Sequence, residues 1–402
     1  MNKVYGAYCR SYQAVFRVVS KALDWTGPQV LKGPGSVKKL PSVLKGNGIK
    51  NVMIVTDKGL HSLGLLNSLK EGLETKGINY VVYDGTQPNP TIPNVEEARE
   101  LYINHNCEAV IAFGGGSPMD CAKVAAARVA APGKMIPSMR GTLKVLAKLP
   151  PLYAVPTTAG TGSETTIAAV IVNPETHEKF AINDPCLRPK MAALDPELTV
   201  GLPPHITSTT GMDALTHAVE AYIGLSNTPA TKAAAEKAVK MIFANLETAY
   251  NEPKNIEARD NMLNASFYAG IAFTQAYVGY VHAIAHNLGG FYNIPHGLAN
   301  AIILPYVLRY YGEDIYDKLA DLADIAGLKT EGMSREEKAN FFIDEICAMN
   351  ARMKIPSSFD CIKEEDIPTI AERAMYEANP LYPVPKLMDE EQCQQIIRSM
   401  MF

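Results

Sequence analysis

Five residues of the types that bind metals fall at spacings that place them on shared helix faces. The sequence holds eight histidines in 402 residues, and His282, His286 and His296 lie in one short stretch, while Asp213 and His217 form a second pair upstream. Residues four apart in an α-helix lie on the same face, so each pair points two side chains at one place. Two such helix faces could close on one metal ion.

His296 stands in a different local context from the other histidines. Pro295 breaks the helix before it and Gly297 permits a turn after it, so a third backbone segment supplies this imidazole. A single histidine in an apolar helix is usually a hydrogen-bonded core residue, but three imidazoles buried without a shared partner would carry a large desolvation cost. The pattern therefore favours a metal site, with five candidates for three or four ligand positions.

A glycine-rich run follows a stretch with the composition of a buried strand. Residues 109–113 (AVIAF) predict the strand, residues 114–117 (GGGS) follow it, and a helix is expected to begin near Pro118. Glycines let a pyrophosphate approach the backbone, and the N–H groups and dipole of the helix face the anion. The run predicts a diphosphate site, although many strand-to-helix turns use glycine for conformation alone.

Two further segments strengthen the prediction of a nucleotide site. Residues 156–164 (PTTAGTGSE) place hydroxyl side chains after another strand, where ligands bind in open α/β sheets. Asp57 closes the strand NVMIVTD, and a carboxylate there could accept hydrogen bonds from ribose hydroxyls and repel a 2′-phosphate. In the common dinucleotide motif the acid follows the glycines by about 20 residues, whereas Asp57 precedes them. A surface aspartate at a turn is the alternative.

The elements that position these residues divide the chain in two. From residue 51 to about 195, short β-branched runs alternate with helical stretches, which predicts an α/β domain with a mainly parallel sheet. Beyond residue 201 the periodicity is helical, for example over 207–222, 231–250 and 258–273. We therefore expect an α/β nucleotide-binding domain over 1–200, with residues 1–25 as an N-terminal extension, and an all-helical metal and substrate domain over 201–402.

Charge and composition exclude several classes of partner. A net charge of −4 leaves no basic surplus for a nucleic acid. No apolar run reaches the length of a membrane span, and the start lacks the pattern of a secretory signal. The seven scattered cysteines form no CxxC pair and fit a reducing compartment. We expect a cytoplasmic protein without an integral membrane segment, whose extension packs on its own domain or on a partner subunit.

The combination of motifs resembles the iron-containing alcohol dehydrogenase family over nearly the whole chain from about residue 28. The strings that carry the resemblance are VTDKG, GTQPNPT, GGGSPMDCAK, PTTAGTGSE, TGMDALTHAVEAY and GYVHAIAHNLGGFYNIPHGLANA, in the family's order and spacing. One departure is Ala168, where some members of the family have an asparagine. The resemblance implies an α/β dinucleotide-binding domain followed by an all-α metal-binding domain, an architecture shared with dehydroquinate synthase.

The resemblance also assigns roles to individual residues. It implies metal ligation by Asp213, His217, His282 and His296, with His286 as a non-ligand that handles a proton or contacts substrate. The implied dinucleotide contacts are Asp57, Asn89, Gly116, Ser117, Thr157, Thr158, Thr161 and Lys179, and the glycine-rich run adds Gly115 and Asp120 as candidates. Phe273 is a candidate for the substrate pocket, although an aromatic residue at helical spacing is more often part of a core.

The implied activity is hydride transfer between a primary alcohol or small diol and NAD(H), with NADP(H) less favoured. Three imidazoles and one carboxylate without a thiolate suit Fe(II) or Zn(II), which would polarise the substrate oxygen. The resemblance also implies a homodimer or larger homo-oligomer. Two alternatives stay open. One is a dehydroquinate synthase-like lyase, which would need a cluster of basic residues that residues 270–300 lack, and the other is a non-catalytic metal or nucleotide binder.

Overall fold

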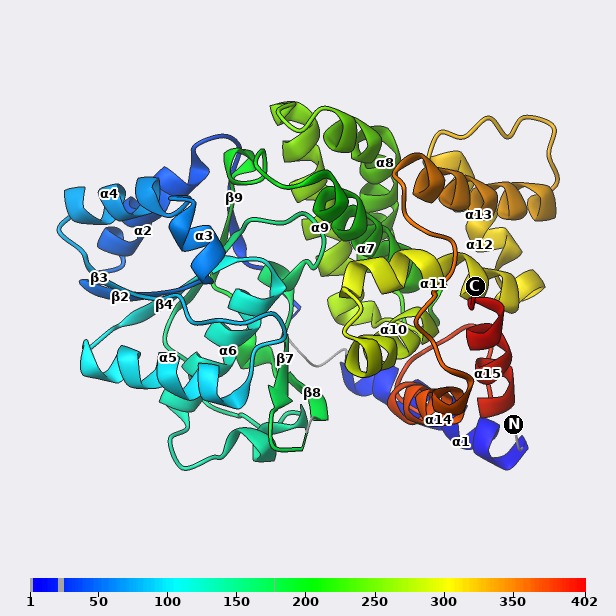
Figure 1. Cartoon of the computed structure of the whole chain (residues 1–402), viewed down its shortest axis with the longest axis horizontal. Coiled ribbons are helices and arrows are strands. Elements are labelled where there is room, and N and C mark those ends of the chain that lie inside the picture. The colour runs from blue at the N-terminus through cyan, green and yellow to red at the C-terminus, as the bar shows by residue number, and fades with distance from the viewer. Residues whose placement is uncertain (1–2, 21–24, 177) are drawn as a thin grey trace. The chain divides into compact units, whose positions relative to one another are not determined.

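The computed structural model describes residues 3–20, 25–176 and 178–402. These residues form two compact units. Figure 1 colours the elements of both units by residue number. One unit is Thr26–Gly201, and the other combines Leu202–Phe402 with the N-terminal segment. The first unit is α/β and the second is built from helices, which confirms the predicted fold class.

A six-stranded parallel sheet forms the centre of the α/β unit. Its strands lie in the order β1-β9-β6-β4-β2-β3. Their bounds are β1 Gln29–Lys32, β2 Asn51–Val55, β3 Asn79–Tyr83, β4 Ala109–Gly114, β6 Leu152–Pro156 and β9 Met191–Leu194. Because the strands are parallel, the carboxyl ends of β2, β4 and β6 meet at one edge of the sheet.

Helices cover both faces of this sheet, as Figure 1 shows. On one face, α2 (Leu40–Gly46) and α4 (Asn67–Thr75) bury leucines against alternate residues of the strands. On the other lie α5 (Ile92–Asn104) and α6 (Gly116–Ala130), while α3 (Lys58–Ser62) directly follows β2. Burial on both faces explains why β2 and β4 read as continuous apolar runs in the sequence.

A second, smaller sheet contains residues 168–173 (AAVIVN), one of the β-branched runs of the sequence. It consists of β5 (Gly141–Thr142), β8 (Glu178–Asn183) and β7 (Ala168–Asn173), and β7 pairs with β8 in antiparallel register. β7 is therefore half of a hairpin, separate from the six-stranded sheet. This hairpin carries Lys179 on its second strand.

The helical unit contains the helices that carry the Asp/His cluster. They are α7 Pro204–Ile223, α8 Pro229–Asn251, α9 Ile256–Ala276, α10 Tyr280–Tyr292 and α11 His296–Tyr311, followed by α12 Tyr316–Ile325, α13 Arg335–Arg352, α14 Ile367–Ala378 and α15 Glu390–Ser399. Side chains cap several of them, since Thr228 forms a capping box with Thr231 at the start of α8 and the Asn255 side chain accepts from the backbone N–H of Ala258 in α9.

The N-terminal helix α1 (Lys3–Ser20) belongs to the helical unit, whereas the expected domain boundaries placed it with the α/β domain. Two of its side chains bind backbone carbonyls near the other end of the chain. The Arg10 guanidinium donates to the carbonyl of Val384 at 2.7 Å, and the Gln13 amide donates to that of Tyr382 at 2.7 Å. The sequence does not indicate which distant carbonyls satisfy the polar side chains of such a helix.

Of the helices in the described part of the chain, none combines the length and the apolar character that crossing a membrane requires.

Candidate metal centre and nucleotide-binding loops

Three helices of the helical unit supply the predicted metal ligands. Asp213 and His217 lie one turn apart on α7, His282 lies in the first turn of α10, and His296 is the first residue of α11. Pro295 immediately precedes α11, as the sequence predicts. Gly297 lets the start of α11 approach α7, because a Cβ at this position would overlap the backbone carbonyl of Thr209.

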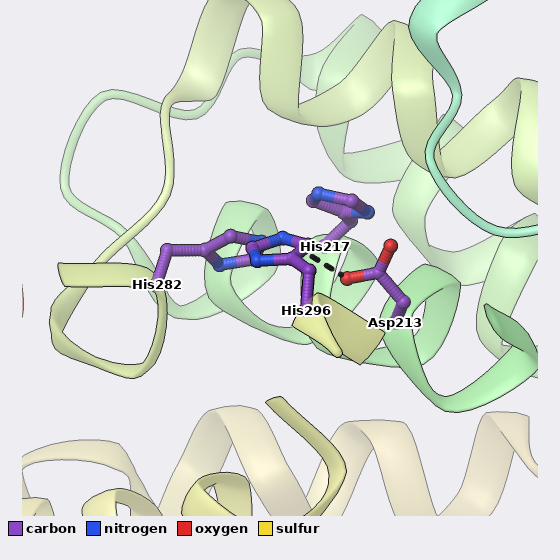
Figure 2. A group of neighbouring side chains, drawn as sticks. All are labelled: Asp213, His217, His282 and His296. Carbon is purple, nitrogen blue, oxygen red and sulfur yellow. Dashed lines mark ion pairs between the residues drawn. The ribbon is translucent and has the colours of Figure 1, made fainter. Parts of the chain in front are cut away.

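The four side chains converge on one point. One potential ligand atom from each of Asp213, His217, His282 and His296 lies within 4.8 Å of the others, and Figure 2 shows the three imidazoles and the carboxylate turned toward one another. The His296 Nε2 and the Asp213 Oδ1 are 3.5 Å apart. Asp213, His217 and His282 are buried, whereas the His296 side chain is 33% exposed. The cluster is therefore accessible from the side of His296.

The buried side chain of Asn300 indicates where the lone pairs of these ligands point. Its Nδ2 lies 2.7 Å from the Asp213 Oδ1, 3.1 Å from the His282 Nε2 and 3.1 Å from the His296 Nε2. The amide donates to the Asp213 carboxylate, and both imidazole nitrogens face the same point, so three potential ligand atoms are directed at a common centre. Such a set, with imidazole and carboxylate donors and no thiolate, fits a borderline divalent cation.

The buried carboxyl group of Glu220 contacts His282 at the ring nitrogen that faces away from the cluster. Glu220, on α7, places its Oε2 2.6 Å from the His282 Nδ1 and accepts from the backbone N–H of Val281 at 2.9 Å through Oε1. Burial, together with the nearby imidazoles, holds the pKa of His282 well below its usual range. The ring is therefore neutral, which leaves one of its nitrogens free of a proton and able to ligate a metal.

His286 lies beside this group but outside it. Its ring centroid is 5.1 Å from that of His296, and its Nδ1 lies 2.7 Å from the Glu377 Oε1, which also accepts from the Tyr382 hydroxyl at 2.9 Å. The His286 side chain is 28% exposed. This arrangement suits an imidazole that exchanges a proton with its surroundings.

Phe273, the predicted pocket residue, lies against a metal-ligand candidate. Its ring stacks on that of His217, with centroids 4.0 Å apart and an interplanar angle of 11°. It is partly exposed, so it both packs on the ligand and contributes apolar surface beside it.

In the α/β unit, the two predicted nucleotide loops lie against each other at the carboxyl ends of β4 and β6. The backbone N–H of Thr157 donates to the carbonyl of Gly114 at 3.1 Å. A Cβ on Gly115 would lie 3.3 Å from the Thr158 hydroxyl, and one on Gly116 would lie 3.2 Å from the Thr161 methyl group. Glycine thus permits this close packing at the start of α6.

Three candidates that are distant in the sequence meet beside these loops. The Lys179 Nζ donates to the Asn89 Oδ1 at 2.9 Å, and the Asn89 backbone N–H donates to the Ser117 hydroxyl at 3.3 Å. The positive φ of 55° at Asn89 makes the turn that allows this approach. A lysine, an amide and a hydroxyl at the start of a helix form a surface that suits a phosphate.

The interactions of Asp120 are with the protein itself. One carboxylate oxygen accepts from the Ser163 hydroxyl at 3.3 Å and the other from the backbone N–H of Val170 at 3.0 Å. Nearby, the buried Lys123 ammonium donates to the Ser163 carbonyl at 2.7 Å and to the Ala168 carbonyl at 2.8 Å. These side chains fix the second loop on α6, and a direct contact between Asp120 and a cofactor stays a prediction.

Asp57 caps a helix. Its Oδ1 accepts from the backbone N–H of Leu60 at 2.9 Å, which makes it the N-cap of α3. The residue lies just beyond β2, next to β4 in the sheet. The capping role matches the alternative of an aspartate at a turn, and a ribose contact stays a prediction.

Sequence reasoning missed the residues that support the cluster. Asn300 follows His296 by four residues, so the same helical spacing rule could have found it. Glu220 follows His217 by three residues on α7 and carried the same signal. Glu377 had no such signal, because it reaches His286 from α14, and only tertiary packing brings the two together.

Comparison with known proteins agrees with this geometry over both units. Residues 27–196 match the model of iron-containing alcohol dehydrogenases, and residues 207–401 match that of the C-terminal part of the Fe-containing alcohol dehydrogenase family. The chain is 39% identical over 383 residues to 1,3-propanediol dehydrogenase of Citrobacter freundii, covering 94% of this chain and 98% of the relative.

Two further comparisons cover a similar extent. The chain is 36% identical over 374 residues to NAD-dependent methanol dehydrogenase of Bacillus methanolicus, covering 92% of this chain and 98% of that protein. A crystal structure of 1,3-propanediol oxidoreductase superposes with a TM-score of 0.91 at 37% identity, covering 94% of this chain and 99% of that one. The chain therefore belongs to the iron-containing alcohol dehydrogenase family and is an oxidoreductase of that family.

Proposed function

We propose that this protein is a metal-dependent dehydrogenase that interconverts a primary alcohol or small diol and its aldehyde with NAD(H). The observation that carries the proposal is the convergence of Asp213, His217, His282 and His296 within 4.8 Å, with potential ligand atoms of three of them around one point. When bound, Fe(II), or alternatively Zn(II), would polarise the substrate oxygen, and the nicotinamide would exchange the hydride.

The side chains around the cluster supply the proton handling. His286 is held through Nδ1 by Glu377, so its Nε2 is the nitrogen that takes up a proton as the alcohol is oxidised and returns one as the aldehyde is reduced. Imidazole suits this role because its ordinary pKa lies near neutrality. Phe273 adds an apolar wall beside His217 that excludes water from the reacting carbon.

For the cofactor, we propose that the loops of the α/β unit bind NAD(H) in preference to NADP(H). Gly115, Gly116 and Ser117 at the start of α6 would receive the diphosphate, together with Lys179 and the threonines of the second loop. Asp57 would bind the ribose hydroxyls and disfavour a 2′-phosphate. One relative is named as an NAD-dependent enzyme and another as acting on 1,3-propanediol, which supports a small alcohol as the substrate.

Anaerobic reconstitution tests the proposal directly. Metal-depleted protein is loaded with Fe(II) or Zn(II), and NADH formation is followed with a panel of short primary alcohols and diols, with the corresponding aldehydes tested in the NADH-consuming direction. We expect turnover that depends on the ion and on NAD(H). Binding of ion and NAD without turnover across the panel would indicate a non-catalytic binder. Conversion of a substrate without net change in NADH would indicate a lyase.

A further inference from the structure

Glu220 connects two helices at the back of the Asp/His cluster. It lies on α7, one turn beyond His217, and its side chain reaches the start of α10, where it meets Val281 and His282. Both partners of the Glu220–His282 pair are almost completely buried, with side-chain exposures of 2% and 3%. The pair therefore interacts without screening by solvent.

The surroundings of His282 determine which of its nitrogens carries the proton. The His282 Nε2 faces the cluster, 3.1 Å from the Asn300 Nδ2, and its Nδ1 faces the Glu220 Oε2 at 2.6 Å. A neutral imidazole that ligates an ion through Nε2 has its single N–H on Nδ1, where the Glu220 oxygen accepts it. This tautomer leaves the Nε2 lone pair directed at the centre of the cluster.

Burial also raises the pKa of Glu220, to about 8, while three backbone N–H groups at the start of α10 act to lower it. The contacts of this side chain with His282 and Val281, and not its charge, are what single it out.

The carboxylate of Glu220 lies close to the backbone that precedes α10. A Cβ on Gly279 would lie 2.8 Å from the Glu220 Oε1, so a side chain at this position would displace the carboxylate. The same oxygen accepts from the Val281 N–H. Glu220 thus also caps α10, and a purely structural role is the competing explanation.

We propose that Glu220 is a positioning residue of the metal centre, which fixes His282 as an Nε2 ligand. The inference rests on the proposed metal-dependent function. Outer carboxylates that bind ligating histidines contribute about 10–100-fold to metal affinity in other proteins. An effect of that size distinguishes this role from capping alone, which acts on the stability of the metal-free protein.

Glu220→Gln tests the proposal. The substitution keeps the size of the side chain but replaces one carboxylate oxygen with an NH2 group. If this NH2 faces the Val281 N–H, two donors oppose each other. If it faces the His282 Nδ1, that nitrogen must accept, and the proton of the imidazole moves to Nε2. We expect the affinity for Zn(II), measured by competition with a chelator, to fall about 10–100-fold. Glu220→Asp keeps the carboxyl group and should retain more of the affinity. Glu377→Gln, at the non-ligand His286, is the matched control and should bind Zn(II) as the wild type does.

The possible outcomes separate the inference from the function on which it rests. Wild-type affinity in folded Glu220→Gln would overturn the positioning role, while absence of Zn(II) binding by the wild type itself would refute the metal centre. If Glu220→Gln does not fold, ¹⁵N-histidine NMR of the Zn(II)-loaded wild type decides the matter. The proposal requires His282 to carry its proton on Nδ1, and a proton on Nε2 would refute it.

Discussion

Among the candidate ligands, His282 has the most narrowly determined position. Glu220 holds its Nδ1, Asn300 contacts its Nε2, and the His217 ring stacks on it with centroids 4.5 Å apart. His296, by contrast, is partly exposed at the first position of its helix. Because three neighbours fix the side chain of His282, no nearby side chain can move into its place when it is removed.

His282→Ala is therefore expected to abolish the stoichiometric ion and turnover together. The remaining three side chains would lack one ligand, and the Glu220 carboxylate would be left buried without its imidazole partner. Metal content by elemental analysis and NADH formation are the measurements. His105→Ala, at an exposed histidine, is the control and should change neither. Full metal content in His282→Ala would exclude it from the ligand set.

His286 is expected to affect proton transfer without affecting the ion. His286→Gln removes the group that accepts a proton but retains a side chain that reaches Glu377. We expect unchanged metal content, lower turnover and an altered dependence of turnover on pH, recorded from steady-state rates across the pH range. A variant with the wild-type pH profile would show that protons leave the site by another route.

Asp57 has two roles that a pair of variants can separate. Asp57→Asn removes the charge but keeps an N-capping side chain, while Asp57→Ala removes both and should cost an additional ~0.5–2 kcal/mol in the free energy of unfolding. If Asp57 repels a 2′-phosphate, both variants should shift the ratio of kcat/KM for NAD over NADP toward NADP by about tenfold, which corresponds to ~1.4 kcal/mol. An unchanged ratio in both would leave Asp57 with its capping role alone.

At the level of elements, apolar periodicity is enough to predict the helices, whereas the sequence does not predict which strands pair with each other. The helices predicted over 207–222, 231–250 and 258–273 correspond to α7, α8 and α9, because each has an apolar pattern and a clear start signal. The run AAVIVN predicts a strand correctly but not its partner. Only four residues separate β7 from β8. A parallel pair requires a longer crossover connection, so two strands joined by so short a segment can pair only as an antiparallel hairpin.

The candidate site shows the same division between local pattern and tertiary packing. Asp213, His217 and His282 could be predicted because spacing along a helix determines which side chains share a face. The contacts of Glu377 with His286 and of Lys179 with Asn89 join segments far apart in the chain. No spacing rule reports such contacts, since they depend on how helices and hairpins pack.

Gly297 determines how closely α11 approaches α7. In Gly297→Ala the new methyl group would overlap the Thr209 carbonyl, so α11 must shift and carry His296 away from Asp213. We expect weaker Zn(II) binding together with a loss of stability of ~1–3 kcal/mol. Gly290→Ala on α10, where a Cβ would meet nothing within 4 Å, should leave the affinity unchanged. Equal affinity in both variants would contradict this account of the helix contact.

For the molecule as a whole, the two units contain different candidate sites. The proposed ion would join α7, α10 and α11 of the helical unit, whereas the proposed NAD contacts lie in the α/β unit. A ligand that binds only the native state stabilises it by about 2.7 kcal/mol at 100 times its dissociation constant. Each ligand should first protect the unit whose segments it joins, since local opening there breaks its contacts.

Hydrogen exchange followed by mass spectrometry measures how much each ligand protects each segment of the chain. We expect Zn(II) to slow exchange mainly in peptides covering 204–311, and NAD to slow it mainly in peptides that contain the loops after β4 and β6. In His282→Ala the protection by Zn(II) should disappear while the protection by NAD remains, because the α/β unit contains none of the metal ligands. Protection by Zn(II) that persists in His282→Ala, or protection by NAD that spares both loops, would contradict this assignment of ligands to units.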